Sequence, residues 1–216
     1  MKKIFSLLIL LLLASAVTAP LHAGQKEKGK LSYNGFSGGM MLHTGYLYGG
    51  RTTVFDGAGL RVSDQKMRGM PTGIGGAVKF HFGKWLRIGT EGYVSTLKYG
   101  DHGSNIRVGW GGILVDGIWK TGGRISPFAG FTVGGGSASN LTLATEAPDD
   151  FIAEENASFR KYPFACIVPY VGLEYDATSR VRIVLKADYM INVSNSQPDF
   201  PSGPRIYIGF LFYRGH

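Results

Sequence analysis

Charged residues of both signs recur on one face of several strand-like segments, and they are the side chains best suited to chemistry. Paired carboxylates can act as general acid and base, whereas carboxylates buried beside cations form ion pairs. Because unpaired charges in a dry interior are costly, the mixture of signs favours a structural ion-pair network over a catalytic site. The predicted network consists of seven residues: Lys79, Arg87, Glu91, Glu174, Arg182, Lys186 and Asp188.

The stretch Arg180–Val193, RVRIVLKADYMINV, indicates the kind of element that carries these charges. Val181, Ile183 and Leu185 alternate with Arg182, Val184 and Lys186. A period of two residues is typical of a β-strand with one apolar and one polar face. The pattern leaves open whether the apolar face looks inward to a core or outward to lipid.

Similar patterns predict an all-β fold of eight antiparallel strands in up-and-down order. The strands are expected at 33–48, 72–83, 85–98, 106–119, 124–138, 163–176, 180–193 and 204–214. Glycines lie inside several of these segments, as in GIGGAVKF and PFAGFTVGGG. Glycine usually weakens a strand unless the backbone must bend or leave space, and a small barrel requires both. In the strand at 106–119 the faces are ambiguous, because Trp110 and Leu114 share a face with Asp116.

The connections between these strands are predicted to alternate in length. GKW, KTGG and DATS are short, whereas the segments between 48 and 72, around YGDHGSN, at 139–162 and around SNSQPDFPSG are longer. This asymmetry is typical of a transmembrane barrel with periplasmic turns and extracellular loops, and an even strand number places both termini in the periplasm. The first long connection is basic and the third is acidic.

Three features favour lipid on the outside of the barrel over a soluble lipocalin-like carrier with an apolar pocket. The polar face contains small residues such as Gly75, Ala77, Gly130 and Gly134, which suit a narrow interior. The charges on that face have both signs, as a paired network requires. Aromatic residues near the strand ends suit interfacial girdles; they are Trp85, Trp119, Tyr175, Tyr189 and Phe212.

The N-terminal sequence predicts export. Lys2 and Lys3 precede an apolar run too short to span a membrane, and small residues before position 24 offer cleavage sites. We therefore predict a signal peptide at 1–23, a short periplasmic stub at 24–32 and an outer-membrane barrel at 33–216. Removal of residues 1–23, which hold two lysines and no acids, lowers the formal charge from +8 to +6. Cys166 is the single cysteine, which excludes an internal disulfide framework.

The segments ISPFAGFTVGGG and IVPYVGLEYD resemble a strand motif, proline-aromatic-small-glycine, of small outer-membrane barrels of the OmpX, OmpW and opacity-protein type. The resemblance implies the eight-stranded architecture and insertion by the barrel-assembly machinery, and says nothing of activity. Such chains usually end on an aromatic residue, whereas here Arg214, Gly215 and His216 follow Tyr213. The insertion signal is then expected at Phe212 or Tyr213.

The segment NVSNS, Asn192 to Ser196, faintly resembles the His-x-Ser-Asn motif of outer-membrane lipid A deacylases. In that motif a histidine activates the serine nucleophile. Asn192 occupies the histidine position, and an amide cannot take the proton from Ser194, so a turn is the preferred interpretation. His43, His81 and His102 are too scattered to predict a metal site. We expect no catalytic residue, no metal and no cofactor.

The sequence thus predicts an outer-membrane barrel of a Gram-negative bacterium with a structural or surface-interaction role, including that of an accessory subunit in a larger outer-membrane complex. The expected partners are outer-membrane lipid or lipopolysaccharide, the barrel-assembly machinery and other outer-membrane proteins; nucleic acid is not expected for an exported chain. The main alternative is transport of small hydrophobic molecules, as in OmpW-like barrels, which requires an apolar mouth near Phe36, Met41 or Leu47. A lipid A-modifying enzyme and a soluble carrier are less favoured.

Overall fold

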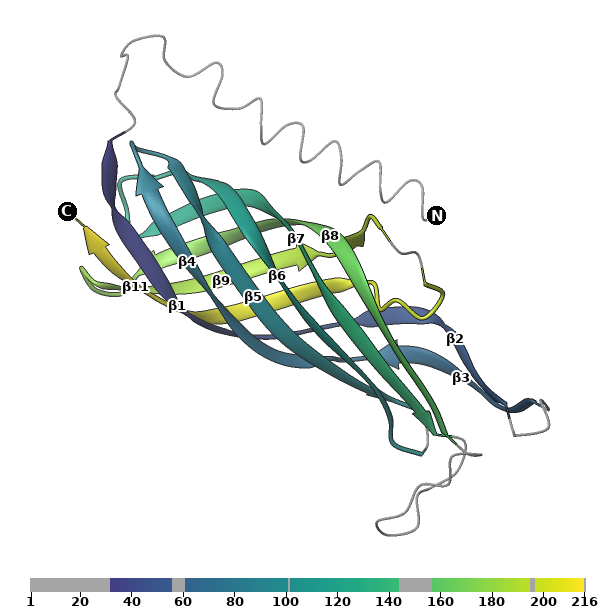
Figure 1. Cartoon of the computed structure of the whole chain (residues 1–216). Coiled ribbons are helices and arrows are strands. Elements are labelled where there is room, and N and C mark those ends of the chain that lie inside the picture. Colours follow the sequence, from purple (N-terminus) through teal and green to yellow (C-terminus); the bar gives the residue numbers. More distant parts are fainter. Residues whose placement is uncertain (1–31, 56–60, 101, 144–156, 195–196, 216) are drawn as a thin grey trace, which may run out of the picture.

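The strands of the protein close into a barrel, as the computed structural model in Figure 1 shows. The structure describes residues 32–55, 61–100, 102–143, 157–194 and 197–215. The predicted signal peptide and all of the stub except Ser32 lie outside these residues. Among the described residues there is no helix long and apolar enough to cross a membrane.

The regular elements of the described residues are β-strands. Their bounds are β1 Tyr33–Gly45, β2 Leu47–Phe55, β3 Arg61–Gly69, β4 Thr72–Phe82, β5 Leu86–Tyr99, β6 Ser104–Ile118, β7 Ile125–Leu143, β8 Ala157–Asp176, β9 Val181–Tyr189, β10 Ile191–Asn192 and β11 Pro204–Gly215.

Eight of these strands form the barrel wall by pairing antiparallel with their neighbours. The order around the ring is β1, β4, β5, β6, β7, β8, β9 and β11, and β11 pairs again with β1. The two-residue β10 continues the line of β9 and pairs with β8. The predicted fold class, an eight-stranded antiparallel up-and-down barrel, is confirmed, and each predicted strand overlaps one strand of the wall.

The connections differ from the prediction in three places. The segment between β1 and β4 is not an open loop, because β2 and β3 pair as a hairpin that extends past the barrel (Figure 1). Strands β7 and β8 stay paired up to Leu143 and Ala157, so much of the predicted acidic loop is strand. The connection between β5 and β6, predicted to be long, consists of residues 100–103 only. It is shorter than the connection of residues 119–124 between β6 and β7, which was predicted to be a short turn. The five acidic residues between 146 and 155 lie outside the described residues.

The barrel turns its apolar face outward, which answers the question posed by Arg180–Val193. Ile183 and Leu185 are 45% and 48% exposed, whereas Arg182, Lys186 and Asp188 are at most 7% exposed. In β6, Trp110, Leu114 and Asp116 all lie inside the barrel. The interior therefore holds apolar, aromatic and charged side chains together.

Inward-facing glycines make room for large side chains on the next strand. A Cβ at Gly172 of β8 would lie 2.3 Å from Cζ of Phe128 on β7. A Cβ at Gly75 of β4 would lie 2.3 Å from Cδ1 of Tyr93 on β5. In a narrow eight-stranded barrel, small residues must face large ones for the interior to be filled.

The aromatic residues predicted for membrane girdles lie at both ends of the wall. Trp85, Tyr175 and Phe212 are exposed at the end that carries the tight turns, where Trp119 is half-buried. Tyr189 lies at the opposite end, and its hydroxyl is 2.9 Å from the hydroxyl of Tyr48. This distribution matches two aromatic bands that flank an apolar belt.

Candidate functional site

The interior of the barrel contains two adjoining groups of ion pairs. The first is centred on Asp116 of β6, whose side chain is almost completely buried. Lys79 Nζ lies 2.9 Å from Asp116 Oδ2, and Arg87 Nη2 donates to the same oxygen at 3.0 Å. Tyr170 donates its hydroxyl proton to it at 3.1 Å. Three strands besides β6 thus converge on one carboxylate.

Glu174 of β8 is the second anion of this group. It pairs with Arg87 from β5 and with Arg182 Nη1 from β9 at 3.3 Å. Lys79 Nζ lies 3.9 Å from its Oε1. Arg87 therefore bridges two carboxylates, one on the neighbouring strand and one on the far side of the barrel.

The second group lies around Lys186 of β9. Its Nζ donates to Glu91 Oε2 at 2.8 Å, and Thr132 donates to the other oxygen of Glu91 at 2.6 Å. Asp188 accepts from Arg205 Nε at 2.8 Å. The Lys186 ammonium also lies 4.3 Å from the ring centroid of Tyr207, within range of a cation–π interaction.

All seven residues singled out from the sequence face the interior and take part in these two groups. Two further members, Asp116 and Arg205, were not predicted. Asp116 shares one face of its strand with Trp110 and Leu114, and this alternation was the sequence signal that could have placed it inside the barrel. Arg205 could have been found by parity, because it alternates with the outward residues Ile206 and Ile208 of β11.

The arrangement favours cross-bracing of the wall over acid–base chemistry. Each of the four interior carboxylates, Glu91, Asp116, Glu174 and Asp188, lies within 3.3 Å of at least one cation. A carboxylate held as the ionised partner of a buried cation is a poor proton shuttle. Some of the pairs join strands that are not neighbours, such as β5 with β8 and β5 with β9.

In the NVSNS segment, the described residues Asn192 and Ser194 make hydrogen bonds typical of a strand end, and Asn195 and Ser196 lie outside the described residues. The Asn192 side-chain oxygen accepts a hydrogen bond from the Ser194 amide at 3.1 Å. The Ser194 hydroxyl oxygen accepts one from the Ala165 amide at 2.7 Å. Local bonds of this kind are the usual role of asparagine and serine where a strand ends.

The three histidines lie apart from one another. His43 packs against the rings of Tyr93 and Tyr207, at centroid distances of 5.7 and 4.8 Å. His81 lies 2.9 Å from the hydroxyl of Ser37. Within the described part of the chain, no three histidine, cysteine or acidic residues are grouped closely enough to hold a metal ion.

The mouth of the barrel opposite the tight turns is crossed by residues 197–203, which we call the strap. The strap pairs with β2, because Tyr48 and Ser202 exchange two backbone hydrogen bonds of 2.7 and 3.0 Å. On the other side, buried Asp199 accepts from Asn140 Nδ2 at 3.0 Å and pairs with Arg160. The ring of Phe200 meets that of Phe164 edge-on at 5.1 Å. The strap is therefore anchored to β2, β7 and β8.

The electrostatics of the strap involve one further residue of β8. Burial and the neighbouring Asp199 carboxylate raise the pKa of Tyr162 above its ordinary value. The Tyr162 hydroxyl is protonated near neutral pH even at its ordinary pKa, and this shift keeps it protonated in mildly alkaline solution as well.

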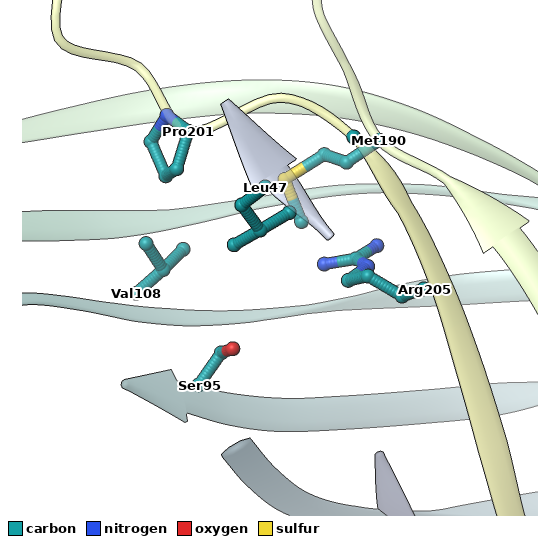
Figure 2. A pocket seen from close by; sticks show the side chains of 7 residues that line it. Leu47, Ser95, Val108, Met190, Pro201 and Arg205 are labelled. Atoms are coloured by element: carbon teal, nitrogen blue, oxygen red, sulfur yellow. The ribbon is translucent and has the colours of Figure 1, made fainter. Parts of the chain in front are cut away.

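A small pocket remains between the strap and the interior charges, as Figure 2 shows. Leu47, Met190, Pro201 and Val108 supply apolar walls, and Ser95 and Arg205 supply the polar ones. Its volume of about 10 Å³ is of the size that one water molecule requires. Of the residues that a transport role would require at an apolar mouth, Leu47 lines this pocket and Met41 is buried inside the barrel. Phe36 does not meet this requirement of the transport hypothesis, because it is exposed opposite Arg214 at the turn end.

Comparison with solved structures places this fold among small outer-membrane barrels. Neisserial surface protein A matches with a TM-score of 0.55 at 12% identity, over 84% of this chain and 98% of that one. OprG from Pseudomonas aeruginosa matches with a TM-score of 0.53 at 12% identity, over 88% and 100%. Ail from Yersinia pestis, in complex with the heparin analogue sucrose octasulfate, matches with a TM-score of 0.52 at 10% identity, over 83% and 99%.

No protein-family model matches the sequence, and no curated protein is significantly similar to it. At 10–12% identity the structural matches establish the fold alone. The chain has the fold of a small outer-membrane β-barrel protein with transmembrane strands, which confirms the predicted resemblance to the OmpX and OmpW type. This fold supports an outer-membrane location.

Proposed function

We propose that the protein is a closed outer-membrane barrel with a structural and surface-interaction role. In this role the barrel anchors the chain, and the end that carries the β2–β3 hairpin and the strap meets other molecules. Such a barrel can act as an accessory subunit of a larger outer-membrane complex. Its partners are outer-membrane lipid or lipopolysaccharide, other outer-membrane proteins and, during insertion, the barrel-assembly machinery.

The observation that carries the proposal is the filled interior. Buried ion pairs link β4, β5, β6, β8, β9 and β11 inside the barrel, and some of them cross its interior. Large side chains such as Phe128, Tyr170 and Tyr207 occupy the remaining space. Eight-stranded barrels have an interior that side chains can fill completely, which leaves no path for bulk diffusion.

We further propose that both termini and the tight turns face the periplasm. The start of β1 and the end of β11 pair at one end of the barrel, where the turns after β4, β6 and β8 also lie. The hairpin extends from the other end (Figure 1). Short periplasmic turns and longer extracellular segments are the rule for bacterial outer-membrane barrels.

Transport of small hydrophobic molecules is the second candidate, favoured by the apolar walls of the pocket beneath the strap. The walls contributed by Leu47, Val108 and Met190 would suit an apolar solute. The small volume of this pocket argues against such a role, because a solute larger than water would have to displace the strap.

The experiment that tests the proposal is a measurement of conductance and solute flux with the folded protein in bilayers. The wild-type barrel is expected to give no step conductance and no flux of small apolar solutes. A variant in which residues 197–203 are replaced by a glycine–serine linker is expected to remain closed as well. Conductance of the wild type would contradict the proposal, and conductance of the linker variant alone would assign closure to the strap.

A further inference from the structure

Three cations lie side by side on the outer surface of β5, β6 and β8. Arg107 of β6 pairs in register with Ser139 of β7, and Ser139 pairs with Lys161 of β8. Lys98 of β5 lies opposite Asn105, two residues along the strand from Arg107. Since neighbouring strands are about 4.8 Å apart, the backbones of Arg107 and Lys161 are separated by roughly 10 Å. Long side chains at that spacing can converge on one polyanionic group.

These three side chains are exposed and carry their charge without a protein counterion in the part of the chain that the structure describes. Arg160, the nearest basic neighbour in sequence, differs because it pairs with Asp199 and donates to Gln197. We call Lys98, Arg107 and Lys161 the basic row. An exposed, uncompensated row of cations attracts anions.

The height of the basic row matches the far boundary of a membrane. Arg107 lies 10 residue steps along β6 from Gly117, and Lys98 lies 12 steps along β5 from Leu86. At about 3.3 Å per step and a tilt near 40°, these steps rise roughly 25 and 30 Å. The apolar band of an outer-membrane barrel is about 25 Å tall. The basic row therefore lies at the level of the lipid head groups, at the end that carries the hairpin.

Below the basic row, beyond one outward row that contains Val94, Gly109, Ser137 and Pro163, the wall is smooth and faces lipid. Gly92, Gly111, Gly135 and Ala165 pair in register across β5 to β8 and point outward. One row further toward the turns, the exposed side chains become bulky again, with Ile113 at 63% exposure. Extended acyl chains can pack closely against small residues in a membrane, as helices do.

We propose that the basic row is a binding site for a phosphorylated, multiply acylated lipid. The phosphates contact Arg107, Lys161 and Lys98, and the acyl chains lie along the glycine wall below. Arginine suits phosphate because its planar guanidinium can donate two parallel hydrogen bonds. The site rests on the orientation proposed above, which places the basic row in the outer leaflet, where lipopolysaccharide supplies lipids of this chemistry.

Native mass spectrometry of the folded full chain in neutral detergent, titrated with bis-phosphorylated lipid A, tests the site. We expect the double variant Arg107→Ala/Lys161→Ala to bind about 30-fold more weakly, because each cation near an anionic surface contributes about 1 kcal/mol. The charge-retaining variant Arg107→Lys/Lys161→Arg should keep most of the binding. The matched control Lys84→Ala/Lys120→Ala, which loses two exposed cations at the turns, should bind as the wild type does.

Further ligands separate the contributions of phosphate and acyl chains. Lipid A without phosphates should bind the wild type weakly, about as weakly as bis-phosphorylated lipid A binds Arg107→Ala/Lys161→Ala. Inorganic pyrophosphate should bind weakly to the wild type and to all variants. The site would be overturned if the wild type and Arg107→Ala/Lys161→Ala bound bis-phosphorylated lipid A with equal affinity. It would also be overturned if Arg107→Ala/Lys161→Ala and Lys84→Ala/Lys120→Ala lost affinity equally. Tight binding of pyrophosphate would overturn the role of the acyl chains. A conducting barrel that still binds lipid A through Arg107 and Lys161 would refute the proposed closed barrel and leave the site intact.

Discussion

At the scale of single residues, the interior is held by charges that are individually costly to bury. Removing a carboxylate or an ammonium group from water carries a penalty of several kcal/mol, which an ion pair repays only with good geometry. Glu91 has such geometry, since Lys186 and Thr132 occupy different oxygens of its carboxylate. The consequence of a substitution depends on whether it leaves a partner unpaired.

Glu91→Leu should lower the stability of the folded barrel by about 3–5 kcal/mol, because it leaves Lys186 buried without its closest anion. The measurement is the midpoint of heat unfolding in mild detergent, followed by gel mobility. The double variant Glu91→Leu/Lys186→Met should recover most of the loss, since apolar replacement of a whole buried pair is often neutral. An unchanged midpoint in Glu91→Leu would mean that the pair does not brace the barrel.

Gly172→Ala should destabilise the barrel by about 1–3 kcal/mol, the usual cost of overpacking a filled core. The added Cβ would lie 2.3 Å from Cζ of Phe128 and 2.5 Å from the backbone oxygen of Leu185. Gly109→Ala is the matched control on the outer face, where the new Cβ meets only Cγ2 of Val94 at 4.0 Å. Equal midpoints of the two variants in the same heat-unfolding measurement would be evidence against a tightly filled interior.

At the scale of elements, residue periodicity located every strand of the wall but missed how far the strands and hairpin extend. β7 and β8 remain paired through Asn140–Arg160 and Leu143–Ala157, where asparagine, threonine, serine and arginine are interspersed with a few apolar residues. Likewise, β2 and β3 contain glycines and charges that are typical of loops, yet Val54 and Met67 are completely buried. Tertiary contacts, including those with the strap, override weak local preference in these segments.

The orientation of the barrel can be tested with single cysteines at the two ends, in a Cys166→Ser background. Lys66→Cys on the exposed part of β3 should react with a membrane-impermeant maleimide on intact cells. Lys120→Cys in the turn after β6 should react only after the outer membrane is permeabilised. The reverse pattern would place the hairpin in the periplasm and invert the proposed topology.

At the scale of the whole molecule, ring closure is the property that distinguishes this fold from an open sheet. Since β8 pairs with β9 and β11 with β1, the wall has no free edge for another strand or for detergent to open. The exposed apolar band includes Ile113, Val133, Leu185 and Ile208. Such a band would aggregate in water and is stable in contact with lipid.

The unboiled protein, extracted from the outer-membrane fraction, should therefore migrate differently from the boiled protein in a gel with mild SDS. Closure makes unfolding cooperative, so the shift should disappear over a narrow temperature range. The temperature of this transition should fall in Glu91→Leu and stay unchanged in Gly109→Ala. A protein found soluble, with no heat-dependent shift, would refute the assignment to the outer membrane.

The sequence by itself determined the strands, their order and the two faces of the wall, because side chains alternate with a period of two whatever lies on either side. It also determined that Arg87, Glu174 and Lys186 belong to the same face. The small residues and mixed charges of that face already favoured an inward direction, but only the tertiary structure decided which charges meet. Arg87 reaches Glu174 from a strand three places away in the ring, and Lys186 reaches Glu91 across the interior. Such contacts depend on the curvature and closure of the barrel, which bring together residues that local alternation cannot relate.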